Sequence, residues 1–200
     1  MADDDGKAVA AVFVVAYRVQ PLPSVASQSS TGVGGRFSIT GLPAGVYTLC
    51  VQAPAGGYLD PCHWSLKPPQ VILSAGQASA GNALRVRKGS VLKVRVNDPG
   101  GLLQTTGRTG VPRQVVMGVW SPTTPFFPAR PVGGDAMGMN YEVTIPFDLP
   151  VRFSMTSAHV RFADATAIPV GASGFSEVVQ HRTGEVAPKS YTFTVNSALP

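Results

Sequence analysis

Residues 37–49 show the clearest hydrophobic pattern in the chain. Phe37 and Ile39 alternate with polar residues, which is the two-residue period of a half-buried strand. Residues 41–45 contain the glycines and the proline that tight turns favour. Residues 46–51 are apolar at both parities, which is typical of a strand inside a sandwich rather than at its edge. The pattern therefore predicts a hairpin of two strands.

Similar short apolar segments recur between clusters of glycine and proline, and each predicts a strand. They lie at residues 8–18, 71–73, 80–86, 91–96, 115–120, 139–145, 151–155, 160–162, 175–180 and 191–195, with a short edge strand near Val25. The first segment is almost continuously apolar, so periodicity alone leaves a helix open there, while its valines, Phe13 and Tyr17 favour a strand. No segment combines helix caps with an apolar stripe of 3.6-residue period. The sequence predicts an all-β chain.

The hairpin pattern occurs a second time, which indicates two domains. Residues 141–154 repeat the features of residues 37–49, namely apolar alternation, a turn with proline and a second alternating segment. We expect two tandem Ig-like or transthyretin-like β-sandwiches, at residues 1–88 and 89–200. The junction is too short for a flexible linker.

The composition argues against several classes of protein and of binding partner. A hydrophobic content of 44% argues against disorder. The net charge of +5 comes from scattered basic residues, except for the run Arg85-Val86-Arg87-Lys88, in which Arg85 and Arg87 would point to one solvated face of a strand. Nucleic-acid binding is not expected, because no basic stripe with interleaved aromatic residues is present. No transmembrane segment is expected, because the apolar stretch at residues 8–17 is too short to span a bilayer.

The two cysteines, Cys50 and Cys62, predict a disulfide that closes a short loop. Such a bridge stabilises a protein by about 3 kcal/mol through reduced chain entropy. Two unpaired buried thiols are the alternative. A metal site is not expected, because Cys50, Cys62 and His63 do not form a zinc pattern. A disulfide is typical of proteins in an oxidising compartment.

No motif of an enzyme is present in the sequence. His63, His159 and His181 are widely separated, and none lies in a metal-binding motif. A serine nucleophile elbow and a phosphate-binding glycine loop are both absent from the sequence. The acidic residues form no recognisable catalytic pair. We expect no enzymatic activity, no cofactor and no bound metal.

Aromatic residues in the expected loops are the remaining candidates for binding. Tyr58 and Trp64 flank the cysteine loop, and Trp120, Phe126 and Phe127 flank a proline-rich segment. Aromatic side chains at the end of a sandwich can stack on sugar rings or anchor a protein contact. Alternatively, these residues only cover the ends of the sandwiches or the seam between the domains.

Residues 5–88 resemble the carboxypeptidase regulatory-like domain, a transthyretin-like β-sandwich of secreted and surface bacterial proteins. The resemblance rests on Gly-Lys-Ala-Val-Ala at residues 6–10, Val-Val-Ala-Tyr at residues 14–17 and Gly-Leu-Pro-Ala-Gly-Val-Tyr at residues 41–47. These elements mark a fold and do not identify a ligand. The second half of the chain is similar only through its turn and hairpin, and the catalytic zinc domain of metallocarboxypeptidases has no counterpart.

One departure from this family suggests a function. Family members carry a strand ahead of the Asp-Gly-Lys turn, whereas this chain begins at that turn, at residues 5–7. A strand from a neighbouring subunit could fill the sheet edge that would be left open. The alternatives are a trimmed chain and a sandwich that closes without that strand.

We therefore expect a non-catalytic structural, adhesive or protein-interaction module of an extracytoplasmic bacterial protein. It would be secreted, periplasmic or on the cell surface, with a protein partner or self-association. The alternative is a carbohydrate-binding module that uses Tyr58, Trp64 or Trp120.

Overall fold

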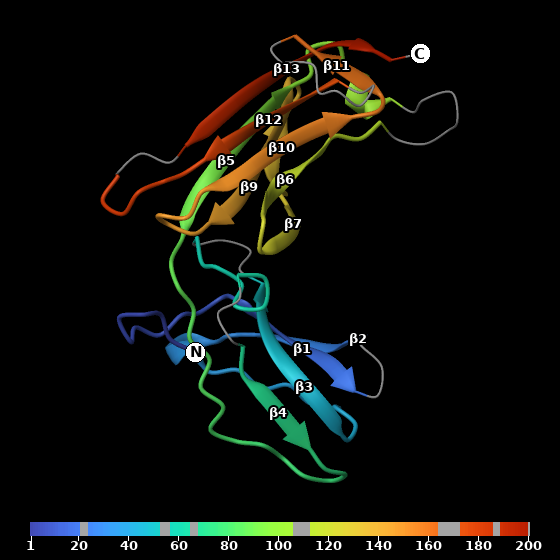
Figure 1. Cartoon of the computed structure of the whole chain (residues 1–200). Coiled ribbons are helices and arrows are strands. Elements are labelled where there is room, and N and C mark those ends of the chain that lie inside the picture. The colour runs from blue at the N-terminus through green and yellow to red at the C-terminus, as the bar shows by residue number, and fades with distance from the viewer. Residues whose placement is uncertain are drawn as a thin grey trace. The chain divides into compact units, whose positions relative to one another are not determined.

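The computed structural model confirms an all-β chain and divides it into two compact units, Met1–Gly89 and Ser90–Pro200 (Figure 1). The structure describes residues 1–20, 24–52, 57–64, 68–105, 113–163, 173–185 and 189–199. Within these ranges the helical segments are two 3-10 turns, η1 (Val33–Gly35) and η2 (Leu102–Gln104).

The first unit is built on one antiparallel sheet of four strands in the order β2-β1-β3-β4 (Figure 1). The strands are β1 (Phe13–Gln20), β2 (Ser24–Ser30), β3 (Gly45–Gln52) and β4 (Gln70–Leu73). β1 and β3 are the central strands. For β3 this agrees with the prediction from its apolar residues, which occur at both odd and even positions. β2 lies at the edge, as expected near Val25. β1 begins later than expected because Ala11 adopts a left-handed backbone, with φ of +58°, and interrupts the extended segment.

The two faces of this sheet are covered in different ways. One face buries Val14, Leu49 and Val51 against extended segments of the same unit. The other face buries Val15 and Cys50, which lie opposite each other on β1 and β3. Both faces are apolar, so the central strands lie between two layers of polypeptide.

The extended segments on the first face do not form a second ladder among the described residues. Ala2 forms isolated bridges with Arg85 and with Ala8, and these bridges join residues 1–3, 84–86 and 7–9. The strand expected at residues 80–86 is therefore wrong, apart from the bridge at Arg85. Extended backbone without pairing leaves donors and acceptors open.

The hairpin expected at residues 37–49 is wrong. Residues 37–40 belong to no strand, and β3 pairs with β1 and β4 instead. Phe37 and Ile39 nevertheless pack against the core, so their alternation reflects a half-buried extended segment. Residues 41–44 carry the chain from the facing layer into the sheet, which explains the turn signal.

The second unit is a sandwich of two sheets, in the orders β12-β10-β6-β7 and β11-β13-β5-β9-β8 (Figure 1). The strands of the first sheet are β12 (Ser173–Val179), β10 (Val151–Ser157), β6 (Val116–Ser121) and β7 (Thr124–Pro128). The strands of the second are β11 (Val160–Phe162), β13 (Ser190–Ala198), β5 (Ser90–Asn97), β9 (Gly138–Ile145) and β8 (Arg130–Asp135). β13 pairs with β5 in parallel, and the other neighbours pair in antiparallel fashion.

Aromatic rings from both sheets fill the interior of this sandwich. Phe153 on β10 is fully buried and stacks on Tyr191 of β13, with ring centroids 5.0 Å apart. Phe175 on β12 lies 5.2 Å from Phe193 on β13 by the same measure. Burial raises the pKa of the Tyr191 phenol, and the hydrogen bond from its hydroxyl to Glu177 raises it further. The cluster links the two layers directly.

The second expected hairpin, at residues 141–154, is also wrong. β9 lies in the five-stranded sheet and β10 in the four-stranded sheet, so residues 146–150 cross from one layer to the other. Pro146 and Pro150 stand at the ends of this connection and have no N–H to give to a ladder between β9 and β10. The connection is instead fixed by Asp148, whose carboxylate accepts hydrogen bonds from the amide and the hydroxyl of Thr183.

Candidate functional site

The first unit contains a groove of about 770 Å³ in the layer that faces the sheet. One wall is made by residues 34–42 and the other by residues 77–82. The floor consists of inward-facing side chains of β3 and β4, which are Tyr47, Leu49, Val71 and Leu73. The groove therefore lies where a second sheet of a complete sandwich would lie.

The floor of the groove is apolar and has its polar groups satisfied. Tyr47 is fully buried, and its hydroxyl donates a hydrogen bond to the carbonyl of Pro43 at 2.6 Å. Leu49 is 5% exposed and Val71 is 9% exposed. Leu73, at the end of β4, is half-buried and packs against the same core. A ligand on this floor gains mainly by burying apolar surface.

The walls of the groove present unpaired backbone. The amides of residues 37–42 and 78–84 donate to no acceptor within the described parts of the chain. At the ends of the walls the Met1 ammonium donates to the Gly35 carbonyl and the Gln77 amide donates to the Ser74 carbonyl. Within the second wall the Asn82 side-chain amide donates to the Ser79 carbonyl at 3.3 Å. Extended backbone with open donors and acceptors is a template for another strand.

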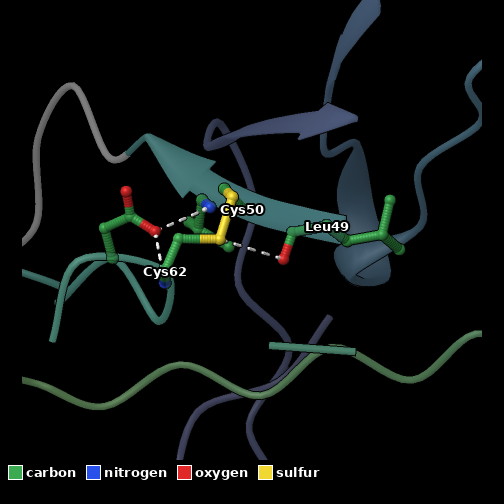
Figure 2. Close-up of a disulfide and its surroundings, with 5 residues drawn as sticks. Leu49, Cys50 and Cys62 are labelled. Atoms are coloured by element: carbon green, nitrogen blue, oxygen red, sulfur yellow. Dashed lines mark hydrogen bonds between the residues drawn. A yellow bond between two sulfur atoms is a disulfide. The ribbon is translucent and has the colours of Figure 1, made fainter. Parts of the chain in front are cut away.

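The predicted disulfide between Cys50 and Cys62 is present and confirms that prediction (Figure 2). The two Cα atoms are 5.4 Å apart, and the sequence separation is 12 residues. The bond fixes the cysteine loop to β3, and Figure 2 shows the Cys62 sulfur beside the Leu49 carbonyl oxygen, at 3.8 Å. The loop therefore covers the face of the sheet opposite the groove.

Asp60 supports the cysteine loop from within. Its carboxylate accepts hydrogen bonds from the amides of Cys62 at 2.9 Å and Val51 at 3.3 Å. Burial raises the pKa of the Asp60 carboxyl, and these amides oppose part of that rise. Cys50, Asp60 and Cys62 bring three potential metal ligands within 4.8 Å. Both sulfurs are committed to the disulfide, so they are not available as thiolate ligands.

The five candidate aromatic residues are divided between the two units. Tyr58 and Trp64 belong to the first unit, whereas Trp120, Phe126 and Phe127 belong to the second. Trp64 is only 7% exposed and meets the His63 ring edge-on, while Tyr58 is half-buried against the core. Both side chains are therefore at least partly buried within the first unit. Burial also lowers the pKa of the His63 imidazole.

Two aromatic residues are exposed on the outer face of the four-stranded sheet. Trp120 is 40% exposed, and its indole N–H donates to the Ser154 hydroxyl at 3.3 Å. Phe126 is 42% exposed and lies over Gly118, where an added Cβ would come within 2.6 Å of its Cζ atom. The Arg152 guanidinium lies 5.8 Å from the centre of the Trp120 ring. The face offers aromatic rings beside hydrogen-bonding groups.

The second unit also contains a cluster of serine, histidine and glutamate that the sequence analysis missed. The Ser90 hydroxyl is hydrogen-bonded to Nδ1 of His181, and Nε2 of His181 lies 3.3 Å from the Glu185 carboxylate. The four-residue spacing of His181 and Glu185 was the available signal. Ser90 is 4% exposed and His181 is 3% exposed, and neither lines the cavity of about 310 Å³ beside Tyr141. The cluster joins the start of β5 to the segment after β12, and its serine and histidine are both buried.

Comparisons with known proteins add little to this picture. No family model matches the sequence, and no curated protein matches it. The C-terminal fragment of pilus adhesin SpaC from Lactobacillus rhamnosus GG is similar at 10% sequence identity, with 100% of this chain and 96% of that fragment covered and a TM-score of 0.25. A TM-score this low does not establish a shared fold. Among the described residues, no helix is long and apolar enough to cross a membrane.

Proposed function

We propose that the protein is a non-catalytic interaction module whose first unit accepts an extended segment of another polypeptide by strand addition. The observation that supports this function is the pair of walls above an apolar floor, whose backbone amides at residues 37–42 and 78–84 donate to no acceptor among the described residues. Strand addition uses main-chain hydrogen bonds for affinity and alternate side chains for specificity. In this groove the wall amides can form the main-chain hydrogen bonds, and the apolar floor can receive the alternate side chains.

The energetics favour a polypeptide over a small ligand. Three apolar side chains placed on the floor contribute roughly 5–9 kcal/mol through burial. That gain only offsets the cost of association, which is about 4–15 kcal/mol. Main-chain hydrogen bonds to both walls, each worth about 1 kcal/mol, then decide whether binding is measurable. A ligand without a repeating backbone forms few of these bonds.

The disulfide supports a place outside the cytoplasm for this module. Such bonds persist in oxidising compartments. The Cys50–Cys62 bond holds the loop against β3 and leaves no free cysteine in the chain. We propose a secreted, periplasmic or cell-surface protein with a structural or adhesive role. Membership of the carboxypeptidase regulatory-like family remains part of this proposal.

The experiment is a binding assay with a defined peptide and a matched pair of variants. The probe is a fluorescent peptide of alternating valine and threonine, with lysine at its ends, and the readout is fluorescence polarisation. Leu73→Lys places a charge on the floor, whereas Ile72→Lys changes the neighbouring side chain, which is 75% exposed on the other face of β4. We expect at least tenfold weaker binding for Leu73→Lys and unchanged binding for Ile72→Lys. Denaturation curves check that both variants fold.

Light scattering of the wild type over micromolar concentrations tests whether a second copy is the partner. Self-association that Leu73→Lys abolishes would identify another copy of this chain. A monomeric protein that also fails to bind the probe would refute the proposed function. Binding that is equally weakened by both lysine variants would place the contact elsewhere.

Carbohydrate binding is a second candidate function, favoured by the exposed face of the second unit. Trp120 lies beside the hydroxyl of Ser154 and the guanidinium of Arg152, and Phe126 is exposed on the same face over Gly118. Sugar rings stack on aromatic faces while their hydroxyls hydrogen-bond to such groups. A glycan array with wild type and Trp120→Ala tests it, with Trp64→Ala as the buried comparison. Absence of signal from the wild type would remove this candidate.

A further inference from the structure

We infer that the protein cleaves its own backbone at the Gly89–Ser90 bond, with the Ser90 hydroxyl as the nucleophile and His181 as the general base. This inference is independent of the groove in the first unit. The reaction is a single turnover on the chain itself and adds no activity on an external substrate. Its products would be two polypeptides, residues 1–89 and 90–200, which are the two compact units.

The first observation is a serine hydroxyl in contact with an imidazole. Ser90 begins β5, and its hydroxyl is hydrogen-bonded to Nδ1 of His181, 91 positions later in the chain. Nε2 is buried and has no hydrogen-bond partner of regular geometry among the described residues, but it lies 3.3 Å from a Glu185 carboxylate oxygen. A carboxylate only accepts hydrogen bonds, so we place the ring proton on Nε2 and the lone pair on Nδ1. That tautomer is the one in which the ring can take the proton of the Ser90 hydroxyl.

The second observation is that this pair is buried and held in place. Ser90 is 4% exposed and His181 is 3% exposed. The Asp148 amide donates to the His181 carbonyl at 2.8 Å, and the Phe147 ring lies 5.5 Å from the imidazole between centroids. Burial hinders the approach of an external substrate, but it does not affect a substrate that is part of the chain. The backbone of Ser90 itself supplies such a substrate.

The substrate is the peptide bond on the amino side of Ser90. The carbonyl carbon of Gly89 is bonded to the Ser90 nitrogen, so its distance from the Ser90 hydroxyl depends only on the torsions of Ser90. The backbone is paired on both sides, because the Gly89 amide donates to the Gly57 carbonyl at 2.7 Å and Ser90 pairs with Ile145 on β9. Gly89 is half-buried and has no side chain, so the hydroxyl and then water can approach its carbonyl carbon.

The reaction needs water as its co-reactant. The Ser90 oxygen adds to the Gly89 carbonyl carbon while His181 takes the hydroxyl proton. The C–N bond then breaks, the leaving nitrogen takes that proton from the imidazole, and an ester joins Gly89 to the Ser90 oxygen. Water adds to the ester carbonyl, the C–O bond breaks, and the Ser90 hydroxyl is restored. The products are a carboxylate on Gly89 and an ammonium on Ser90.

The test incubates the purified full chain at neutral pH with and without hydroxylamine and measures intact masses. Hydroxylamine attacks esters faster than water does, so it should speed the cleavage and leave a hydroxamate on Gly89. The sequence has no Asn-Gly pair, which hydroxylamine also cleaves, and the disulfide lies within residues 1–89, so the fragments separate without reduction. We expect the masses of residues 1–89 and 90–200 from the folded chain, and no cleavage in urea, which separates His181 from Ser90.

Variants of the two reacting side chains identify their roles. Ser90→Ala should abolish cleavage, and Ser90→Cys should retain it, because a thiol also forms an acyl intermediate. His181→Asn should slow cleavage by roughly a hundredfold or more, the usual contribution of a general base. The matched control is Ser121→Ala, which removes another buried hydroxyl of the second unit, bonded to Thr124 rather than to a histidine, and should leave the rate unchanged. Melting curves check that each variant folds.

Glu185 acts through the imidazole and is a positioning residue. Glu185→Ala should slow cleavage less than His181→Asn does, and Glu185→Gln should keep more of the rate, because its amide oxygen still accepts a hydrogen bond from Nε2. A folded chain that stays intact in hydroxylamine would overturn the inference. Cleavage at another bond, such as the acid-labile Asp98–Pro99 bond, or cleavage that persists in Ser90→Ala would do the same. Cleavage that is lost in Ser90→Ala and unchanged in His181→Asn would overturn the role of His181.

Discussion

The two units reach stability by different routes, although both are built from strands. The second unit closes two hydrogen-bonded sheets over a cluster of aromatic rings centred on Phe153. The described residues of the first unit form one sheet, with extended segments that share only isolated bridges on one face and a disulfide-linked loop on the other. Where a second ladder is absent, a covalent bond and side-chain packing hold the layers together. The unpaired backbone that remains is what makes the first unit a candidate for binding.

The chain contains one convenient reporter for each unit. Of its two tryptophans, Trp64 lies in the first unit and Trp120 in the second. Trp120→Phe leaves a fluorescence signal from the first unit alone, and Trp64→Phe leaves one from the second. The predictions below are measured in these two backgrounds, since a chain of two units need not unfold in one step.

The largest expected effect comes from Phe153→Ala in the second unit. Phe153 is fully buried and contacts rings of β12 and β13. Truncation of a buried phenylalanine costs about 3–5 kcal/mol. Urea denaturation in the Trp64→Phe background should show this loss. The control is Phe126→Ala, which removes a ring that is 42% exposed and should cost much less. An equal loss in the first unit would show that the two units are not stabilised separately.

In the first unit, the Cys50–Cys62 disulfide has the stabilising role that the Phe153 cluster has in the second. Replacing both Cys50 and Cys62 by alanine should destabilise this unit by about 3 kcal/mol, as expected for a loop closed over 12 residues. Denaturation in the Trp120→Phe background measures it. Because Cys50 is also buried, the alanine variant loses packed sulfur atoms as well as the bond. The wild type under reducing conditions is the control, since reduction breaks the S–S bond and removes no heavy atom. A first unit that is unaffected by reduction would contradict the contrast between the units.

Gly118→Ala tests how closely the outer face of the second unit is packed. An added Cβ would lie 2.2 Å from the carbonyl oxygen of Phe127 and 2.6 Å from Cζ of Phe126. We expect a loss of about 1–3 kcal/mol, typical of overpacking. Gly100→Ala is the control, because its Cβ would meet the Leu102 side chain at an ordinary 3.6 Å. Recovery of stability in Gly118→Ala with Phe126→Ala would assign the loss to the ring rather than to the β7 backbone.

The sequence was a good guide to which segments are extended, and a poor guide to which other segments they pair with. Alternation at Phe37 and Ile39, and again at Tyr141 and Val143, reports which side chains are buried. It does not report whether the next segment pairs in the same sheet or crosses to the facing layer. Both proline-containing connections cross, so both expected hairpins failed for the same reason. The sequence pattern that the two halves share therefore marks, in each half, a connection that crosses from one layer to the other.

Some features of the candidate site could be predicted from the sequence and others could not. The Cys50–Cys62 bond was predictable because loop length and spacing limit the options for two cysteines. The groove was not, since it arises from backbone that packs without pairing, which no residue type signals. Equal aromatic character also did not distinguish Trp64, which is buried, from Trp120, which is exposed. Trp64 flanks the cysteine loop, whereas Trp120 lies on β6 and not in a loop as expected, so the difference depends on what covers that loop and that face of the sheet.

The smallest expected effect is an opposite response of the two units to acid. Burial raises the pKa of Asp60 in the first unit, so its stabilising contribution is full below about pH 4, the ordinary pKa of an unfolded aspartate, and is lost as the pH rises through the folded-state pKa. Hydrogen bonds from the side chain and amide of Thr183 lower the pKa of Asp148 in the second unit. Its contribution is present above about pH 4 and is lost as the pH falls through the lowered value.

Acidification from neutral pH toward pH 4 should therefore make Asp60 favour the first unit, and further acidification should make Asp148 disfavour the second. Thermal melts at stepped pH in the two tryptophan backgrounds measure the two slopes. Asp60→Asn should flatten the first slope and Asp148→Asn the second. Asn tolerates the left-handed backbone at position 148, where φ is +61°, so the second substitution removes the charge without backbone strain. Parallel slopes in both units would mean that the two carboxylates do not control the response, and would weaken the contrast between a half-buried aspartate and an exposed, hydrogen-bonded one.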